Sequence, residues 1–209
     1  MSELHLSIAH IPLPTRMLKL PVDQRGYPVP WFVIWIDGKP DHRVVDMEKV
    51  RRAILEKRCF TCGEKLGKYL TFNVGPVSLL STISAEPPSH LECIEYAMQA
   101  CPFLSRPYAH RRVTGLPEGT VDVEGMLEHH PIVMTAYTTQ GYQTRNANPG
   151  ILFKLLPPTS VVWWCEGRKA TREECEAGIK LALTKIRSSI NDAFLATALT
   201  RIRQWLPEV

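Results

Sequence analysis

The chain has 209 residues, 44% of them hydrophobic and 22% charged, with a formal net charge of +4. This composition is ordinary for a folded globular protein, and the length suffices for one domain with a large core. The pattern excludes a membrane-spanning segment, because the longest conspicuous apolar run, "WFVIWI" at 31–36, is far too short to cross a bilayer.

The charge is uneven along the chain. Residues 1–112 hold 15 Lys and Arg against 11 Asp and Glu, whereas residues 113–209 hold 10 of each. So mild an excess allows contact with nucleic acid or an acidic protein but does not require it. The first residues lack the basic start and long apolar run of a secretory signal. We therefore expect a cytoplasmic protein whose six cysteines are metal ligands or buried thiols rather than disulfides.

The first elements are an extended segment, a hairpin and a short helix. Proline-rich residues 1–30 predict an extended chain on the surface. Residues 30–45 predict a β-hairpin, because β-favouring residues run into Asp37-Gly38, a pair suited to a type I′ turn. Asp46 is then a predicted N-cap for a helix with apolar residues at helical spacing.

The middle of the chain predicts two strands and a helix. Residues 69–84 read as short strands that turn near the Gly-Pro pair at 75–76. A helix follows, for which Ser89 and Glu92 have the spacing of a capping box, and Pro102 ends it.

The remainder mixes strands and helices. Strands are predicted at 131–138, 150–156 and 160–167, with a polar loop at 139–150 between the first two.

Two C-terminal helices are expected. Thr171 and Glu174 form a second capping box at the start of the first. The helical pattern breaks near 188–192 and resumes to about Leu206. The apolar stripe of the first helix comprises Cys175, Ile179, Leu183, Ile186 and Ile190.

Four residues have the spacing of a zinc site. Cys59 and Cys62 lie in "CFTCGEKLG", where two glycines favour a tight knuckle over the helix start that a thioredoxin-like redox pair needs. His90 follows Cys62 with 27 residues between them, and Cys93 lies three residues beyond His90, on the same side of a helical first turn. Three thiolates and one imidazole suit a closed, tetrahedral structural Zn²⁺ site. The order of knuckle, hairpin and helix is that of a treble-clef zinc finger.

The other cysteines are predicted to be buried thiols. Cys101 lies about 12 Å beyond Cys93 along a helix, so one ion cannot easily bind both. Cys165 is on a predicted strand, and Cys175 is on a helix stripe.

The predicted fold class is α+β, with a treble-clef-like zinc site joined to a small mixed sheet and a C-terminal helical segment. We divide the chain into an extended N-terminal segment at 1–30, a zinc-binding α+β module at 31–105, and an α+β portion with C-terminal helices at 106–209. The last two parts are expected to form one compact unit.

Catalytic interpretations fit the pattern less well. Zinc deaminases place His-x-Glu before the cysteine pair, whereas "HLEC" follows it here. A nuclease of the His-Asn-His type carries a catalytic histidine on the hairpin between the ligand pairs, but 68–85 contains none. His42 beside Asp41, and the pair His129 and His130, lie outside that hairpin. An enzyme whose site gathers such distant residues stays open.

Three stretches together resemble a known group. "PVPWFVIWIDGKPDHRV", "CFTCGEKLGKY" and "GPVSLLSTISAEPPSHLECIEYAMQACPFL" are similar to an uncharacterised family of small bacterial and phage-associated proteins, over roughly residues 27–105. The resemblance implies a zinc-site scaffold at Cys59, Cys62, His90 and Cys93. It implies no reaction, and it suggests a role connected with phages or mobile elements.

A structural metal without a visible catalytic set favours a zinc-stabilised binding protein. It would act through a macromolecular partner, in the first place a protein, and not on a membrane. The candidate partner-binding residues follow the ligand helix or lie in the polar loop: Tyr108, His110, Arg111, Arg112, Tyr142 and Arg145.

The alternative is a nucleic-acid-binding zinc-finger protein. Basic residues flank the knuckle and could form a face for phosphates. Acidic residues are interleaved with them, as in an ordinary solvated helix. The basic set comprises Lys49, Arg51, Arg52, Lys57, Arg58, Lys65 and Lys68, joined by Arg111 and Arg112.

Overall fold

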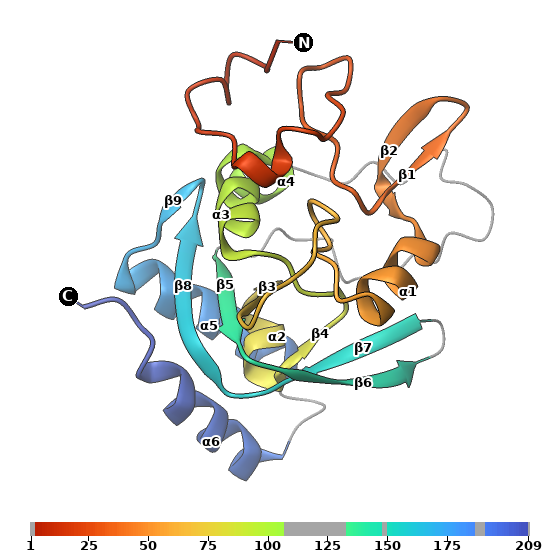
Figure 1. Ribbon diagram of the computed structural model, residues 1–209. Coiled ribbons are helices and arrows are strands. Elements are labelled where there is room, and N and C mark those ends of the chain that lie inside the picture. The colour runs from red at the N-terminus through yellow and green to blue at the C-terminus, as the bar shows by residue number, and fades with distance from the viewer. Residues whose placement is uncertain (1–2, 107–132, 148–149, 187–190, 209) are drawn as a thin grey trace.

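The structure is a computed structural model that describes residues 3–106, 133–147, 150–186 and 191–208 (Figure 1). The described chain is α+β, as predicted, but its sheets are antiparallel rather than mixed. The strands are β1 (Val33–Ile36), β2 (Lys39–Val45), β3 (Leu70–Val74), β4 (Ile83–Ser84), β5 (Met134–Thr139), β6 (Tyr142–Ala147), β7 (Gly150–Leu155), β8 (Pro158–Cys165) and β9 (Arg168–Lys169). The helices are α1 (Met47–Leu55), α2 (Pro76–Ser81), α3 (Leu91–Ala100), α4 (Pro102–Ser105), α5 (Arg172–Ile186) and α6 (Asp192–Arg203).

The first hairpin and helix form as predicted. β1 and β2 pair as a two-stranded sheet, and Asp37 and Gly38 at their turn have φ angles of 48° and 74°. Both values are positive, as a type I′ turn requires. The carboxylate of Asp46 accepts hydrogen bonds from the backbone N–H groups of Glu48 and Lys49, at 3.0 and 3.3 Å, and so caps α1.

The predicted second strand after β3 is instead the helix α2. Gly75 is its N-cap and Pro76 lies in its first turn, where a missing N–H is harmless. Leu79 and Leu80 are buried in the main core. As a result β3 and β4 belong to different sheets, and the hairpin expected between the knuckle and the ligand helix does not form.

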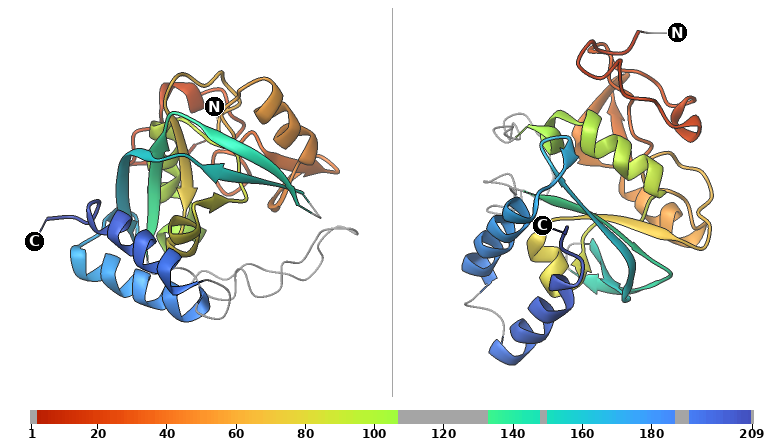
Figure 2. Two further views of the ribbon diagram at one scale, coloured as in Figure 1. Left: turned by 90° about the horizontal axis from the view of Figure 1, so that it is seen from below. Right: turned by 90° about the vertical axis from the view of Figure 1, so that its left-hand side faces the viewer.

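The four-stranded sheet has the order β3-β5-β8-β9 and separates two apolar layers. Neighbouring residues of β5 and β8 point to opposite faces, since side chains alternate along a strand. Tyr137 and Trp163 join the main core with residues of α2, α5 and α6. Ala136 and Trp164 pack on the other face against Ile94 of α3. The ligand helix is thus held on one face of a sheet whose other face carries the main core (Figure 2).

The polar loop predicted at 139–150 contains the strand β6. β6 pairs with β7 over its whole length, in a three-stranded sheet of order β4-β7-β6. Its four central residues, from Gln143 to Asn146, are exposed. The strand therefore lacks the buried alternation by which it could be found.

The C-terminal helices form as predicted. The Thr171 N–H donates to the Glu174 carboxylate at 2.8 Å, and the Glu174 N–H donates to the Thr171 hydroxyl at 3.3 Å, which is a reciprocal capping box. α6 begins after the N-cap Asn191, and the predicted break and Ile190 lie mainly outside the described residues. In the described chain, no helix combines the length and apolar character needed to cross a membrane.

Candidate metal centre

Cys59, Cys62, His90 and Cys93 meet in one cluster. One candidate ligand atom from each lies within 4.8 Å of those of all the others, so the four could hold a metal ion. The His90 Nδ1 lies 3.4 Å from the Cys62 sulfur and 3.9 Å from the Cys93 sulfur. Typical Zn–S and Zn–N bond lengths in a tetrahedron place such atoms about 3.6 Å apart. The spacing therefore fits a small tetrahedral ion.

The knuckle that carries the first two ligands is closed by its own backbone. The Cys59 N–H donates to the Glu64 carbonyl at 2.7 Å, and the Gly63 N–H donates to the Cys59 carbonyl at 2.8 Å. Gly63 has a φ of 76°, and a Cβ there would lie 2.7 Å from the Trp31 ring. The turn thus needs glycine for its conformation and for the close approach of Trp31. The Cys62 N–H points at the Cys59 sulfur, 3.4 Å away, which favours a thiolate.

The other two ligands come from the start of α3. His90 is the N-cap residue, and Cys93 lies in the first turn. Partial positive charge at a helix N-terminus favours a thiolate there. The His90 N–H donates to the Cys59 sulfur at 3.4 Å, so the backbone also joins the helix to the knuckle.

Ser89 acts differently from the capping residue predicted at this helix start. α3 has no side-chain cap, because the Ser89 hydroxyl accepts from the Thr61 N–H at 3.1 Å. The backbone of Ser89 pairs with Thr71 of β3 through two hydrogen bonds. Ser89 therefore ties the knuckle, the strand and the helix together beside the cluster.

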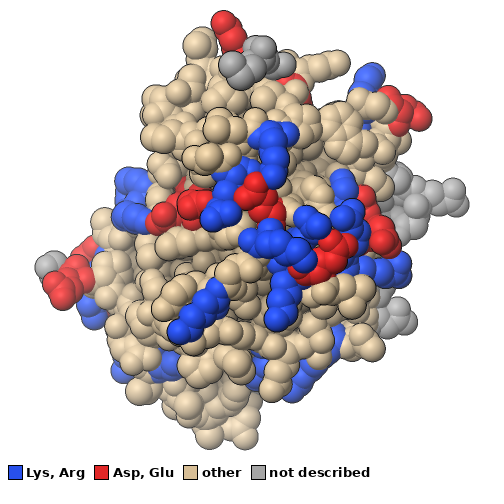
Figure 3. All heavy atoms as spheres, in the orientation of Figure 1, with Lys and Arg blue, Asp and Glu red and all other residues tan. Residues whose placement is uncertain are grey.

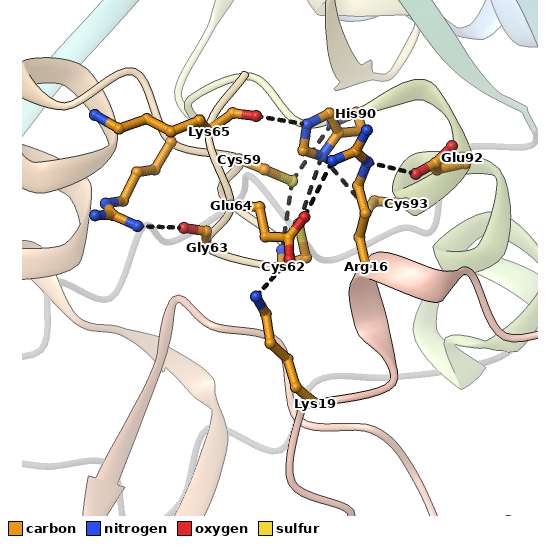
Figure 4. A network of polar contacts seen from close by, with 11 residues as sticks. Arg16, Lys19, Cys59, Cys62, Gly63, Glu64, Lys65, His90, Glu92 and Cys93 are labelled. Atoms are coloured by element: carbon orange, nitrogen blue, oxygen red, sulfur yellow. Dashed lines mark hydrogen bonds and ion pairs between the residues drawn. The ribbon is translucent and has the colours of Figure 1, made fainter. Parts of the chain in front are cut away.

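The His90 ring is oriented by a backbone acceptor. Its Nε2 lies 3.0 Å from the Lys65 carbonyl, which can only accept a hydrogen bond (Figure 4). That contact keeps a proton on Nε2 and turns Nδ1 toward the three sulfurs, so that Nδ1 can bind a metal ion once its own proton is displaced. Protein ligands to metals are commonly held by such an outer contact.

The cluster is electrostatically prepared for a cation. Burial by itself raises the pKa of Cys59, but hydrogen bonds with Cys62, Cys93 and His90 lower it overall. The contacts with the Cys59 and Cys62 sulfurs raise the pKa of His90 to about 10. The same two sulfurs raise the pKa of the Cys93 thiol. Metal binding must therefore displace protons from the imidazole and from the remaining thiols.

An ion-pair network lies over the cluster (Figure 4). The Arg16 guanidinium contacts Glu64 of the knuckle at 3.0 Å and Glu92 of α3 at 2.9 Å. Lys19 also pairs with Glu64. Arg16 and Lys19 belong to the N-terminal segment, so three separate parts of the chain meet at the site. The sequence pattern gave no signal for this contact.

The four clustered residues could supply every position of a tetrahedral metal site. The three cysteines are at most 3% exposed, and His90 is half-buried. A catalytic metal needs an open position for water or substrate, and four close protein ligands leave none. The arrangement thus fits a structural site.

The remaining cysteines lie outside the cluster, as predicted. Cys165 and Cys175 are buried in the main core. Cys101 is the C-cap residue of α3, and burial raises the pKa of its thiol. None of the three belongs to a group of metal-binding side chains within the described residues.

Of the predicted partner-binding residues, only two lie in the described chain. The Tyr142 ring packs edge-on against Phe72 and Phe153, with centroids at 5.7 and 5.3 Å, and belongs to the edge of the main core. Arg145 is exposed on β6. The other four lie outside the described residues: Tyr108, His110, Arg111 and Arg112.

Of the histidines considered for catalysis, His42 alone lies in the described chain. The His42 Nε2 lies 3.2 Å from the Asp23 carboxylate, which joins β2 to the N-terminal segment. Burial, with a smaller contribution from Arg25, lowers the pKa of His42. His129 and His130 lie outside the described residues. Comparison with protein-family models, curated proteins and solved structures finds no match to this chain.

Proposed function

We propose that the cluster binds one structural Zn²⁺ ion and that the protein is a zinc-stabilised binding protein, acting through a macromolecular partner rather than by catalysis. The observation that carries the proposal is the closed set of three cysteines and one histidine, with ligand atoms within 4.8 Å of one another. Sulfur-rich tetrahedral sets favour zinc over magnesium or calcium, which prefer oxygen ligands.

The treble-clef comparison is supported by two of its three parts. The cluster draws two ligands from a knuckle and two from a helix start, which is how such fingers hold zinc. The segment between them is β3-α2-β4 instead of a simple hairpin. We infer a related way of holding the ion on a different intervening structure.

Metal analysis of the purified, reduced protein tests the site. One zinc per chain is expected, and Co²⁺ replacement should give the intense visible absorption of tetrahedral cobalt bound to thiolates. Chelator should remove both the metal and the colour. Absence of metal from a fresh reduced sample that also fails to take up Co²⁺ would exclude the proposal.

A protein partner is favoured by exposed apolar side chains on the first hairpin. Trp35 and Ile36 of β1 are 44% and 36% exposed, and Met47, the first residue of the helix α1 that follows the hairpin, is 47% exposed. Aromatic residues and methionine are enriched in protein interfaces. The hairpin lies at the edge of the molecule (Figure 1), where a partner can reach it. Arg145 on β6 remains a second candidate contact.

Native mass spectrometry of the protein isolated gently from its own host tests the partner. We expect a co-purifying protein that stays bound to the chain after nuclease treatment. Ile36→Ala should weaken its retention, whereas Leu181→Ala on α5, which has the same 36% exposure, should not. Equal retention by both variants would remove the hairpin from the contact surface, and a partner lost on nuclease treatment would favour nucleic acid.

A further inference from the structure

The N-terminal residues 4–20, here termed the N-terminal strap, contain little regular structure. Within them the structure describes one short 3₁₀ helix, Thr15–Met17. Ile8, Ile11 and Met17 are nevertheless at most 7% exposed. A segment without its own hydrogen-bonded ladder must be held in place by contacts with other parts of the molecule.

The strap is anchored on the metal cluster itself. Its buried side chains share one apolar cluster with all three ligand cysteines and with two residues of α3, Tyr96 and Ala100. The three strap side chains Ile8, Ile11 and Met17 are not members of the main core cluster. Figure 1 shows this part of the chain lying above α3 and the knuckle, away from α5 and α6. The strap therefore depends on the arrangement of the site more than on the rest of the fold.

The polar contacts of the strap follow the same pattern. Arg16 contacts Glu64, which lies two residues after one ligand, and Glu92, which lies between the other two. One guanidinium can bridge both carboxylates only when the knuckle and the start of α3 are side by side. A metal ion that joins these two segments fixes that geometry. Arg16 and Glu92 are about half exposed, so their ion pair adds little stability. It indicates instead that the knuckle and the start of α3 lie side by side.

Two features oppose closure of the strap. The hydroxyl of Tyr96, a residue only 4% exposed, has no hydrogen-bond partner among the described residues. Burial of an unpaired hydroxyl costs free energy that water would relieve. A cavity of about 260 Å³ also lies between the strap and the end of α3, lined by Ile8, His10 and Gln99 among others. Closure of the strap therefore leaves one polar group unpaired and some space unfilled, and the contacts at the site must offset this cost.

We propose that metal binding latches the N-terminal strap: with the ion bound the strap covers the knuckle and α3, and loss of the ion releases it and uncovers the apolar side of the ligand helix. The inference rests on metal binding at the proposed site. Contact with metal-ordered segments makes strap closure and metal binding mutually favourable, and this linkage is reciprocal.

Hydrogen exchange followed by mass spectrometry, on the full chain with zinc bound and after chelation, tests the latch. Amides of the strap, such as those of Ile11 and Leu20 that donate within it, are expected to exchange at least about tenfold faster after chelation. Amides of β5 should stay protected over the time in which the strap amides exchange, since β5 lies in the centre of the main sheet and opens only with the whole fold. Metal content is measured in the same samples.

Two neighbouring positions provide a matched pair of variants. Met17 is 3% exposed and Leu18 is 65% exposed. Met17→Ala should speed strap exchange with zinc bound and, by reciprocity, weaken zinc affinity by about tenfold, as competition with a chelator of known affinity measures. Leu18→Ala should leave both quantities at their original values. The exchange of β5 verifies that each variant is folded.

Four outcomes separate the proposals. Faster strap exchange on chelation, with β5 still protected, supports the latch. A chain that binds zinc but shows the same strap exchange with and without it overturns the latch and leaves the metal site intact. Equal loosening of the strap and β5 also overturns the latch, because the strap is then no separate unit. A chain that binds no metal overturns both proposals.

Discussion

Cys62 is the knuckle-side residue of the proposed metal site and belongs to the apolar cluster around that site, not to the main core cluster. Cys62→Ser should therefore lower zinc content well below one per chain and lower the free energy of unfolding by about 3 kcal/mol or more, because metal ligation is coupled to folding. Metal analysis and thermal denaturation of the reduced protein measure both effects.

Cys101→Ser is the matched control, since this cysteine lies outside the cluster. It should retain one zinc per chain and lose at most about 1 kcal/mol. Equal melting temperatures for the Cys62→Ser variant and the unaltered protein would contradict a structural role for the metal.

At the scale of residues, the sequence predicted the four residues that cluster but not the groups that position them. Cysteine and histidine have few common roles, so their spacing carries information. The group that orients His90 is the backbone carbonyl of Lys65. Every residue type has such a carbonyl, so the sequence carries no sign of this contact. Ser89 has the spacing of a capping box, yet its hydroxyl serves Thr61. A motif of neighbouring residues cannot show that the Ser89 hydroxyl will accept a hydrogen bond from a knuckle 28 residues away in sequence.

The capping box of α5 gives a prediction at the scale of the element. The hydrogen bond from Arg168 lowers the pKa of Glu174 to about 2, and the backbone of Thr171 contributes. A carboxylate whose pKa is lowered on folding stabilises the folded state above its unfolded pKa, near 4.3, and this contribution disappears as the pH falls toward 2. Glu174→Gln should therefore destabilise the protein by about 1 kcal/mol at pH 7.

The difference between Glu174→Gln and the unaltered protein should narrow steadily from pH 5 to about pH 2, as chemical denaturation at each pH would measure. Glu176→Gln is a suitable control, because Glu176 forms only an exposed pair with Arg172 on the same helix, at 3.2 Å. It should have little effect at any pH. A constant difference for Glu174→Gln across this range would show that the charge of Glu174 is not what stabilises the helix start.

Elements with local signals were predicted correctly, and those without them were not. The turn at Asp37-Gly38 and the caps at Asp46 and Thr171 depend on residues close in sequence. The run at 76–81 has short apolar spacing that suits either a strand or a buried helix, and α2 forms because Leu79 and Leu80 face the main core. β6 is polar, and its pairing with β7 overrides its low strand propensity.

At the scale of the whole molecule, the sheet order was beyond the reach of the sequence. β3 pairs with β5, although the two strands are separated by α2, β4, α3 and α4 along the chain. Strand pairing over such a distance depends on which apolar faces can be buried together. Many strand orders are compatible with the same hydrophobic pattern in the sequence. The α+β class could be predicted because it requires only that separate helices and strands be recognised, and the structure confirms it.

The distribution of charge over the molecule gives the last prediction. Figure 3 shows acidic side chains set among the basic ones on this face, instead of one continuous basic surface. Glu56 pairs with both Arg52 and Arg58, at 2.9 and 2.5 Å, and these two cations belong to the surface considered for nucleic acid. We therefore expect only weak, nonspecific affinity for mixed-sequence DNA or RNA, with a dissociation constant of about 1 µM or weaker at physiological salt.

Fluorescence anisotropy at low and physiological salt tests this expectation, and Glu56→Gln supplies the informative variant. The substitution removes the shared acidic partner of two arginines, so affinity at low salt should rise by about two- to threefold and should fall more steeply as salt is added. Glu176→Gln makes the same change in net charge on α5, away from the knuckle, and should raise affinity less. Submicromolar binding by the unaltered protein that falls steeply with salt would instead show that the paired arginines exchange their carboxylates for phosphates. The nucleic-acid alternative would then replace the protein partner.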